Sequence, residues 1–246
     1  MASATARRLC PQLIIIRPSM EKYRQASAQI HDIFARYTEQ IEPLSLDEAY
    51  LDVSHCKQED GDAEAIARAI RAGVAQEVGI NISAGIAPNK FIAKIASDWN
   101  KPNGQFAVMP AEVDEFVAAL PVKKLHGVGK VTAAKMQSLG IATCADLRQL
   151  DALALEKHFG SFGRRLGQLC RGIDERPVQT DRIRKSVSVE NTYSKDLKDL
   201  DSCLAELPAL LDQLEKRMER VQQRYRITKQ VVKIKFHDFV QTTVES

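Results

Sequence analysis

Apolar side chains along the chain follow two periods, which together predict a mixture of helices and strands. A repeat of three to four residues predicts amphipathic helices over residues 20–37, 63–78 and 202–225. A further helix is predicted over about residues 90–99. Two extended runs meeting at a bend within residues 41–53 predict a hairpin. Other short apolar or alternating runs predict strands at residues 13–16, 82–87, 105–108, 187–193, 230–239 and 241–245.

The order of these elements indicates the fold class. Up to residue 108, strands and helices are mixed around the hairpin, which favours an α+β sheet with helices on one face. From residue 111 to about residue 184 the pattern changes to short helices and glycine turns. The leucine stripe of residues 202–225 could form a short coiled coil, but the neighbouring strands favour packing on a sheet. The apolar face of the helix over residues 20–37 consists of Tyr23, Ala26, Ile30, Ile33, Phe34 and Tyr37.

Two adjacent carboxylates, Asp47 and Glu48, lie at the bend of the hairpin. Neighbouring side chains within a strand point to opposite faces, but at a hairpin tip this alternation breaks, so both carboxylates can point at one spot. Converging carboxylates are suited to holding a divalent metal ion for phosphoryl chemistry. An acidic pair at a solvated turn can equally have no function, so this stretch alone leaves both interpretations open.

A second candidate site is the segment of residues 122–136, which predicts a helix end, a tight Gly-Val-Gly turn and a new helix. Glycines without Cβ atoms allow positive φ and the close approach of a foreign backbone. Free amides of the turn and the start of the next helix can donate to a phosphate, and Lys123, Lys124, Lys130 and Lys135 add positive charge. This helix-hairpin-helix pattern grips a nucleic-acid backbone without reading bases, although such turns also occur without a ligand.

Composition supports this interpretation only weakly. Residues 1–120 carry a net charge of −4 and residues 121–246 a net charge of +7, which is compatible with an acidic metal site beside a polyanion-binding region. No apolar run approaches the roughly 18 residues of a membrane span. The five cysteines are odd in number and lack CxxC spacing, which argues against a disulfide framework or zinc site and favours a reducing, cytoplasmic location.

Six motifs, in this order and spacing, resemble the Y-family translesion DNA polymerases, in particular the bacterial branch of that family. The motifs are residues 43–52 (PLSLDEAYLD), 83–91 (SAGIAPNKF), 94–98 (KIASD), 100–105 (NKPNGQ), 127–130 (GVGK) and 184–187 (RKSV). The resemblance implies a catalytic palm over residues 18–109, a helical thumb over residues 110–175, a linker over residues 176–186 and a little finger over residues 187–246. Residues 1–17 would be a remnant of the fingers and the re-entry into the palm.

The same resemblance implies roles for individual residues. Asp47 would be a catalytic ligand of a two-Mg²⁺ site, and Glu48 would lie against the metal near the primer hydroxyl. Lys101 would meet the triphosphate of the incoming deoxynucleoside triphosphate, with Tyr23 and Ser45 also at the nucleotide. Primer–template DNA would be bound by Gly127, Val128, Gly129, Lys130, Arg184, Lys185 and Ser186.

The sequence also departs from the family pattern. Family members open with a strand bearing a further metal-binding aspartate, followed by an aromatic residue that excludes ribonucleotides and by the fingers. Those segments, the closing strands of the little finger and the tail that docks on a sliding clamp do not occur in this sequence. The expectation is a monomeric, incomplete polymerase that does not extend DNA on its own. Two other interpretations stay open: a non-catalytic remnant that binds the DNA backbone, and a helix-hairpin-helix repair nuclease.

Overall fold

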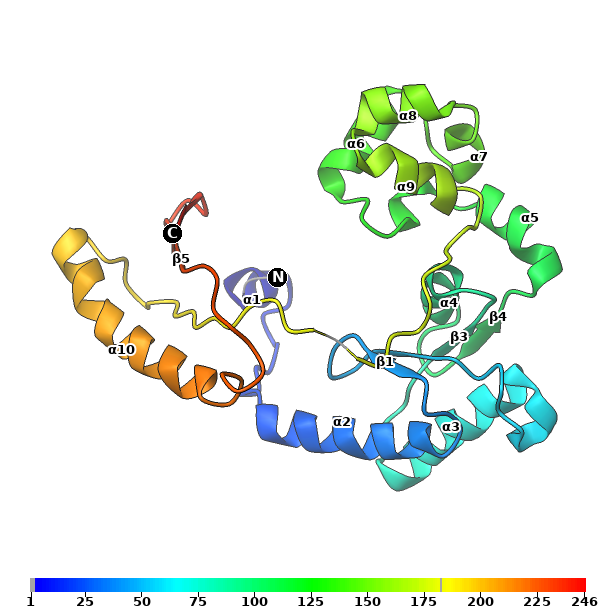
Figure 1. Cartoon of the computed structure of the whole chain (residues 1–246), viewed down its shortest axis with the longest axis horizontal. Coiled ribbons are helices and arrows are strands. Elements are labelled where there is room, and N and C mark those ends of the chain that lie inside the picture. Colours follow the sequence, from blue (N-terminus) through cyan, green and yellow to red (C-terminus); the bar gives the residue numbers. More distant parts are fainter. Residues whose placement is uncertain (1–2, 182) are drawn as a thin grey trace. The chain divides into compact units, whose positions relative to one another are not determined.

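A computed structural model describes residues 3–181 and 183–246 of the chain. Met1 and Ala2, in the predicted fingers remnant, and Arg182, in the predicted linker, lie outside the described residues. The chain forms two compact units, Met1–Asp181 and Arg182–Ser246, and Figure 1 labels most of their elements. No helix within the described ranges is both long enough and apolar enough to cross a membrane.

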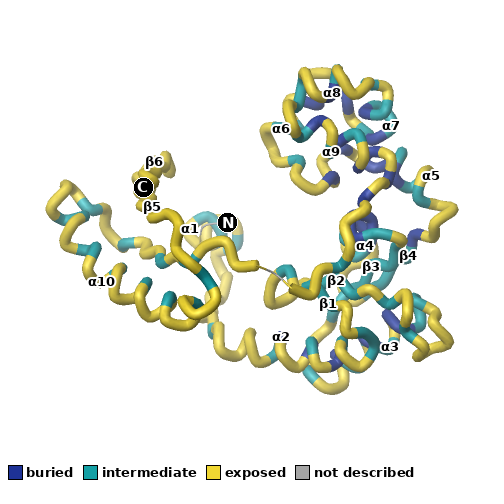
Figure 2. Tube along the Cα trace, viewed as in Figure 1, coloured by how far each residue is buried: buried dark blue, intermediate teal, exposed yellow. Residues whose placement is uncertain are grey.

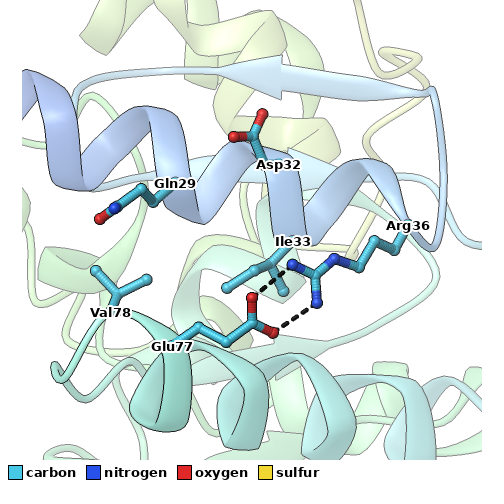
Figure 3. A pocket seen from close by; sticks show the side chains of 6 residues that line it. All are labelled: Gln29, Asp32, Ile33, Arg36, Glu77 and Val78. Carbon is cyan, nitrogen blue, oxygen red and sulfur yellow. Dashed lines mark hydrogen bonds and ion pairs between the residues drawn. The ribbon is translucent and has the colours of Figure 1, made fainter.

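Helices α2 (Met20–Ala35) and α3 (Ala63–Glu77) pack together through a small core. Ile30 and Ile33 of α2 meet Val74 of α3 in this core. The helix ends are joined by a bidentate ion pair in which two nitrogens of Arg36 lie 2.5 and 2.6 Å from the carboxylate oxygens of Glu77 (Figure 3). The buried residues of α2 are Ser27, Ile30 and Ile33, so the apolar face predicted to start at Tyr23 is buried only in part.

The strands pair two by two. β1 (Ile41–Pro43) and β2 (Ala49–Leu51) are antiparallel, with Pro43 opposite Ala49, so residues 44–48 form the connecting loop. β3 (Ala84–Ile86) and β4 (Gln105–Ala107) are parallel and are connected through helix α4 (Lys90–Ser97). The predicted α+β class is confirmed, but in the described residues the strands do not join into one continuous sheet.

Helix α4 lies directly against β3, and a glycine makes this possible. A Cβ built on Gly85 would lie 2.0 Å from the carbonyl oxygen of Ala93, so any larger residue would push the helix away. The start of α4 is capped by Asn89, whose side-chain oxygen accepts from the amide of Ile92. Asn89 therefore marks where this helix begins, and Gly85 allows the helix to approach the strand closely.

Residues after β4 form a group of short helices that share one core with α4. Leu120, Met136, Leu147 and Leu166 of this core are almost fully buried, and Ile92 of α4 belongs to the same cluster. Figure 2 shows buried residues concentrated in these helices and around α4. The predicted palm and thumb thus belong to one compact unit. The helices are α5 (Val113–Ala118), α6 (Lys130–Ser138), α7 (Cys144–Leu147), α8 (Ala152–Phe159) and α9 (Phe162–Leu169).

The second unit contains helix α10 (Leu200–Met218) and the antiparallel pair β5 (Val231–Lys235) and β6 (Gln241–Glu245). None of its described residues is buried, so the expected packing of the leucine stripe on a sheet is not seen there. The strand predicted over residues 187–193 is wrong. Among the described residues, this segment does not pair with a strand. The backbone carbonyl of Ser188 instead accepts a hydrogen bond from the guanidinium of Arg217 at 2.6 Å.

The amino-terminal segment also differs from the prediction. Ser3–Leu9 form helix α1, which the apolar pattern did not predict. The strand predicted over residues 13–16 is wrong, since these residues have no regular structure and Ile14 and Ile16 are 84% and 82% exposed. An apolar run becomes a strand only where a partner strand pairs with it, and among the described residues the run pairs with no strand; the amide of Leu13 donates instead to the carbonyl of Cys10 at 3.0 Å.

Candidate functional site

The loop between β1 and β2 carries the two predicted carboxylates on an ordered backbone. The amides of Leu44 and Ser45 donate to the carbonyl of Glu48, with N–O distances of 2.9 and 3.3 Å. The hydroxyl of Ser45 donates to Oδ1 of Asp47 at 2.5 Å. Because Asp47 and Glu48 are both exposed, the loop presents two carboxylates to solvent from adjacent positions.

Helix α4 contributes a lysine to this loop. Nζ of Lys94 lies 2.8 and 2.9 Å from the two carboxylate oxygens of Glu48, so the ammonium donates to both. The lysine and glutamate side chains are 35% and 46% exposed. The contact joins residues that are 46 positions apart in the sequence, and it holds the carboxylate of Glu48 against α4.

Lys101, the residue expected to meet the triphosphate, follows α4 and lies in the same region. Its Nζ forms an ion pair with Oδ1 of Asp98 at 2.5 Å. The hydrogen bond with Asp98 raises the pKa of Lys101, and the negative charges of Glu48 and Asp47 raise this pKa further. The charges of both carboxylates therefore act on Lys101, and Ser45 belongs to the same loop through its hydrogen bond to Asp47.

The donor atoms of the loop suit a hard divalent cation. Asp47, Glu48 and Ser45 supply carboxylate and hydroxyl oxygens, which are the ligand types that Mg²⁺ prefers. The side-chain types present on this loop therefore fit Mg²⁺ by their chemistry. In the part of the chain that the structure describes, no group of three or more His, Cys, Asp or Glu side chains is arranged to hold a metal ion.

No hydrogen bond or ion pair in the described part of the chain joins the Tyr23 side chain to the β1–β2 loop. Tyr23 lies in the first turn of α2, where its amide donates to the carbonyl of Ser19 at 3.2 Å, and its side chain is 48% exposed. Between described residues, no hydrogen bond or ion pair links Tyr23 to Asp47, Glu48 or Lys101. Its role at the nucleotide stays a prediction.

The Gly-Val-Gly turn before α6 is exposed at both glycines, but the two glycines differ. Gly127 has a φ of 90° and an added Cβ would lie 2.9 Å from Cζ of Phe162. Gly129 has φ −83° and ψ 179°, an ordinary extended conformation, and an added Cβ would meet no atom within 4 Å. Of the two glycines, only Gly127 adopts the positive φ that glycine allows. Between them, Val128 packs against the thumb core and fixes the turn.

The lysines around this turn are only partly available to a ligand. Lys123, Lys124 and Lys130 are exposed. Lys135 instead turns toward α8, where it donates to the carbonyl of His158 and lies 5.7 Å from the centre of the Phe159 ring. The expected contribution of Lys135 to a phosphate site is therefore not supported by its contacts.

The basic segment predicted to bind DNA belongs to the second unit. Arg184, Lys185 and Ser186 are exposed. The amide of Arg184 donates to the hydroxyl of Tyr225 at 3.3 Å, which ties the start of the segment to the residues that follow α10.

Sequence reasoning missed Lys94 as part of the carboxylate cluster. The residue lies within a motif that carries the family resemblance, but its position in an amphipathic helix reveals neither its direction nor its partner.

Three family models match the chain in succession. The impB/mucB/samB family model matches residues 1–98, the DNA polymerase-iota thumb domain model matches residues 123–174, and the impB/mucB/samB C-terminal domain model matches residues 184–246. A DNA polymerase IV from Pseudomonas putida is 61% identical over 245 residues, which cover 100% of this chain and 69% of the relative. The chain belongs to the DNA polymerase IV family. A DNA polymerase IV from Ectopseudomonas mendocina is 59% identical, with 70% of that relative covered.

Solved structures agree with this assignment to the DNA polymerase IV family. A Y-family DNA polymerase chimera matches with a TM-score of 0.89 at 26% identity, covering 100% of this chain and 70% of the chimera. A Dbh ternary complex matches with a TM-score of 0.69 at 25% identity. These similarities confirm the resemblance to Y-family translesion DNA polymerases and the expected enzyme class. They leave the roles of individual residues as predictions.

Proposed function

We propose that Asp47 and Glu48 are metal-binding carboxylates of a nucleotidyl-transfer site that works on DNA. The observation that carries this proposal is the β1–β2 loop, which presents two adjacent exposed carboxylates, Asp47 held by the Ser45 hydroxyl and Glu48 held by Lys94. A bound Mg²⁺ ion would supply Lewis-acid stabilisation of the attacking and leaving oxygens. The substrates would be primer–template DNA and a deoxynucleoside triphosphate.

The chain's own residues would have separate tasks in this reaction. Asp47, positioned by the Ser45 hydroxyl, and Glu48 would orient the cation. Lys101 keeps its positive charge firmly because its pKa is raised, so it can offset negative charge on the triphosphate. The exposed turn around Gly129 and the exposed Lys130 would hold a DNA phosphate without reading bases.

We further propose that the chain acts as a monomer in the cytoplasm. Its five cysteines are free thiols, and burial raises the pKa of Cys144 to about 12. A thiol with so high a pKa is scarcely ionised at neutral pH and reacts slowly. A reducing compartment suits such a chain.

Nucleotide binding tests the proposal most directly. Trp99 is the only tryptophan of the chain and lies between Asp98 and Lys101, so its fluorescence can report a nucleotide at this place. We expect Asp47→Asn, Glu48→Gln and Lys101→Gln each to weaken deoxynucleoside triphosphate binding, in the presence of Mg²⁺ and primer–template, by about tenfold or more. Asp32→Asn, an exposed carboxylate change on α2, is the control and should bind like the parent.

A primer-extension assay on the same proteins distinguishes the open interpretations. We expect the 246-residue chain to bind both substrates without robust extension, because two carboxylates are few for two Mg²⁺ ions that each need about six oxygens. Strong extension abolished by Asp47→Ala would place the reaction at this site and contradict the expected incompleteness. Nucleotide binding indifferent to Asp47 and Glu48, with DNA binding retained, would make the chain a DNA-binding module. Cleavage of labelled DNA with Mg²⁺ and no nucleotide would identify a nuclease.

A further inference from the structure

The bidentate contact between Lys94 and Glu48 places a positive charge where a metal ion would need the same carboxylate. Both oxygens of Glu48 accept from Nζ of Lys94, at 2.8 and 2.9 Å. A metal-binding carboxylate with both oxygens already engaged must give up at least part of that contact when a cation arrives. Lys94 therefore competes with a cation for Glu48.

The backbone on both sides of this contact is fixed, so the lysine cannot simply move away. Ile92 and Ala96 of α4 are fully buried, and α4 is held close to β3 at Gly85. On the other side, the carbonyl of Glu48 accepts from two amides of its own loop. Only the flexible stem of Lys94 can adjust, while its charge stays beside the loop.

The charges around the loop nearly balance. Asp47, Glu48 and Asp98 are negative, and Lys94 and Lys101 are positive. The ion pairs are partly exposed, so each is weak in water and can be displaced by a divalent cation. A divalent cation can therefore displace Lys94 from Glu48, but it must compete with the lysine for the carboxylate.

We propose that Lys94 is a positioning residue that acts as a resident counter-ion for Glu48 and lowers the affinity of the loop for divalent cations when no nucleotide is bound. The inference rests on the proposed function, because it takes Asp47 and Glu48 as the cation ligands. It predicts that the loop binds cations weakly by itself. A deoxynucleoside triphosphate, whose phosphates are negatively charged, would bring the cation with it.

Direct cation binding tests this proposal without an activity assay. Mn²⁺ binding to the 246-residue chain would be measured by electron paramagnetic resonance, and Mg²⁺ binding by calorimetry, both at low ionic strength and without nucleotide. We expect Lys94→Gln to tighten binding about two- to fivefold, the range that a partly exposed ion pair provides. Lys94→Arg keeps the charge and the two-pronged contact, so its affinity should stay at the parental level.

Arg36→Gln is the matched control. It removes one positive charge from another bidentate pair of similar exposure, Arg36 with Glu77 (Figure 3), and should leave cation binding unchanged. Circular dichroism would show that each variant is folded.

The remaining outcomes separate this inference from the proposed function. If Asp47→Asn and Glu48→Gln weaken cation binding but Lys94→Gln leaves it unchanged or weaker, the counter-ion role of Lys94 is refuted and the metal site stands. If neither carboxylate change affects cation binding, the metal site is refuted together with the inference.

Discussion

Asp174 has a buried carboxylate that pairs with two arginines. Its side chain is fully buried, and its oxygens lie 2.8 Å from Arg165 and 2.7 Å from Arg176. Burial alone would raise the pKa of Asp174, but hydrogen bonds from Arg176 and Arg165 outweigh burial and hold this pKa well below its usual range. Since Arg165 is on α9, the cluster fastens the end of the thumb to the segment that leaves it.

We predict that Asp174→Asn lowers the free energy of unfolding by about 2–4 kcal/mol at pH 7. Removing one partner of a buried pair costs about 3–5 kcal/mol, and the partial exposure of both arginines reduces that cost. Urea denaturation followed by Trp99 fluorescence measures the change, because Trp99 lies in the same unit as Asp174. The exposed neighbour Glu175 provides the control, and Glu175→Gln should change stability by less than about 0.5 kcal/mol.

The pH dependence of this effect has a definite sign. The folded pKa of Asp174 lies below its value in the unfolded chain, about 3.9. The stabilisation is therefore fully present above about pH 4 and is lost as the pH falls below that value toward the folded pKa. The difference in the free energy of unfolding between the parent and Asp174→Asn should therefore decrease as the pH falls from 4 to 3. A constant difference across that range would contradict it.

At the scale of elements, the turn before α6 separates a structural glycine from a candidate binding glycine. Gly127 adopts positive φ and faces Phe162, whereas Gly129 adopts extended backbone with open space around its missing side chain. Internal packing therefore requires glycine at position 127 only. Close approach of a foreign backbone, such as a DNA phosphate, gives a physical reason for glycine at position 129.

Substituting the two glycines in parallel tests this division. We predict that Gly127→Ala lowers stability by about 1–3 kcal/mol, because alanine at positive φ is strained and Phe162 must move. Gly129→Ala should leave the thermal unfolding midpoint within about 1–2 °C and weaken duplex DNA binding about five- to tenfold, as expected for one lost phosphate contact. Unchanged DNA binding by a stable Gly129→Ala protein would remove the turn from the binding surface.

Elements that carry their own signals could be predicted from the sequence, and elements that need a distant partner could not. Helices α3 and α4 were predicted close to their observed ends, since each has an apolar face and a side-chain cap, Asp62 and Asn89. The strands expected at residues 13–16 and 187–193 did not form. A strand depends on hydrogen bonds from elsewhere in the chain, which local alternation cannot guarantee.

At the scale of the whole molecule, the sequence could predict which carboxylates and which lysine form the candidate site. It could not predict the ion pair that Glu48 makes with Lys94. Motif order pointed to Asp47, Glu48 and Lys101, and the charges of both carboxylates raise the pKa of Lys101. The partner of Glu48 is Lys94, 46 residues away, and a contact of that span depends on how α4 approaches the β1–β2 loop. Long-range ion pairs follow from the packed fold, so no local pattern reveals them.

The uneven charge of the chain predicts how DNA binding should respond to salt. Residues 121–246 carry a net charge of +7, and the proposed DNA contacts at Lys130, Arg184 and Lys185 all lie in that half. Each phosphate contact releases counterions, so the logarithm of the binding constant should fall linearly with the logarithm of salt concentration, with a slope of about −0.9 per contact.

We predict that the double variant Arg184→Gln/Lys185→Gln makes the slope shallower by about 1–2, equally for unrelated DNA sequences. Lys229→Gln, which removes an exposed lysine paired with Glu245, should leave the slope unchanged. A shallower slope in the control alone, or a loss confined to one DNA sequence, would contradict backbone binding by this segment.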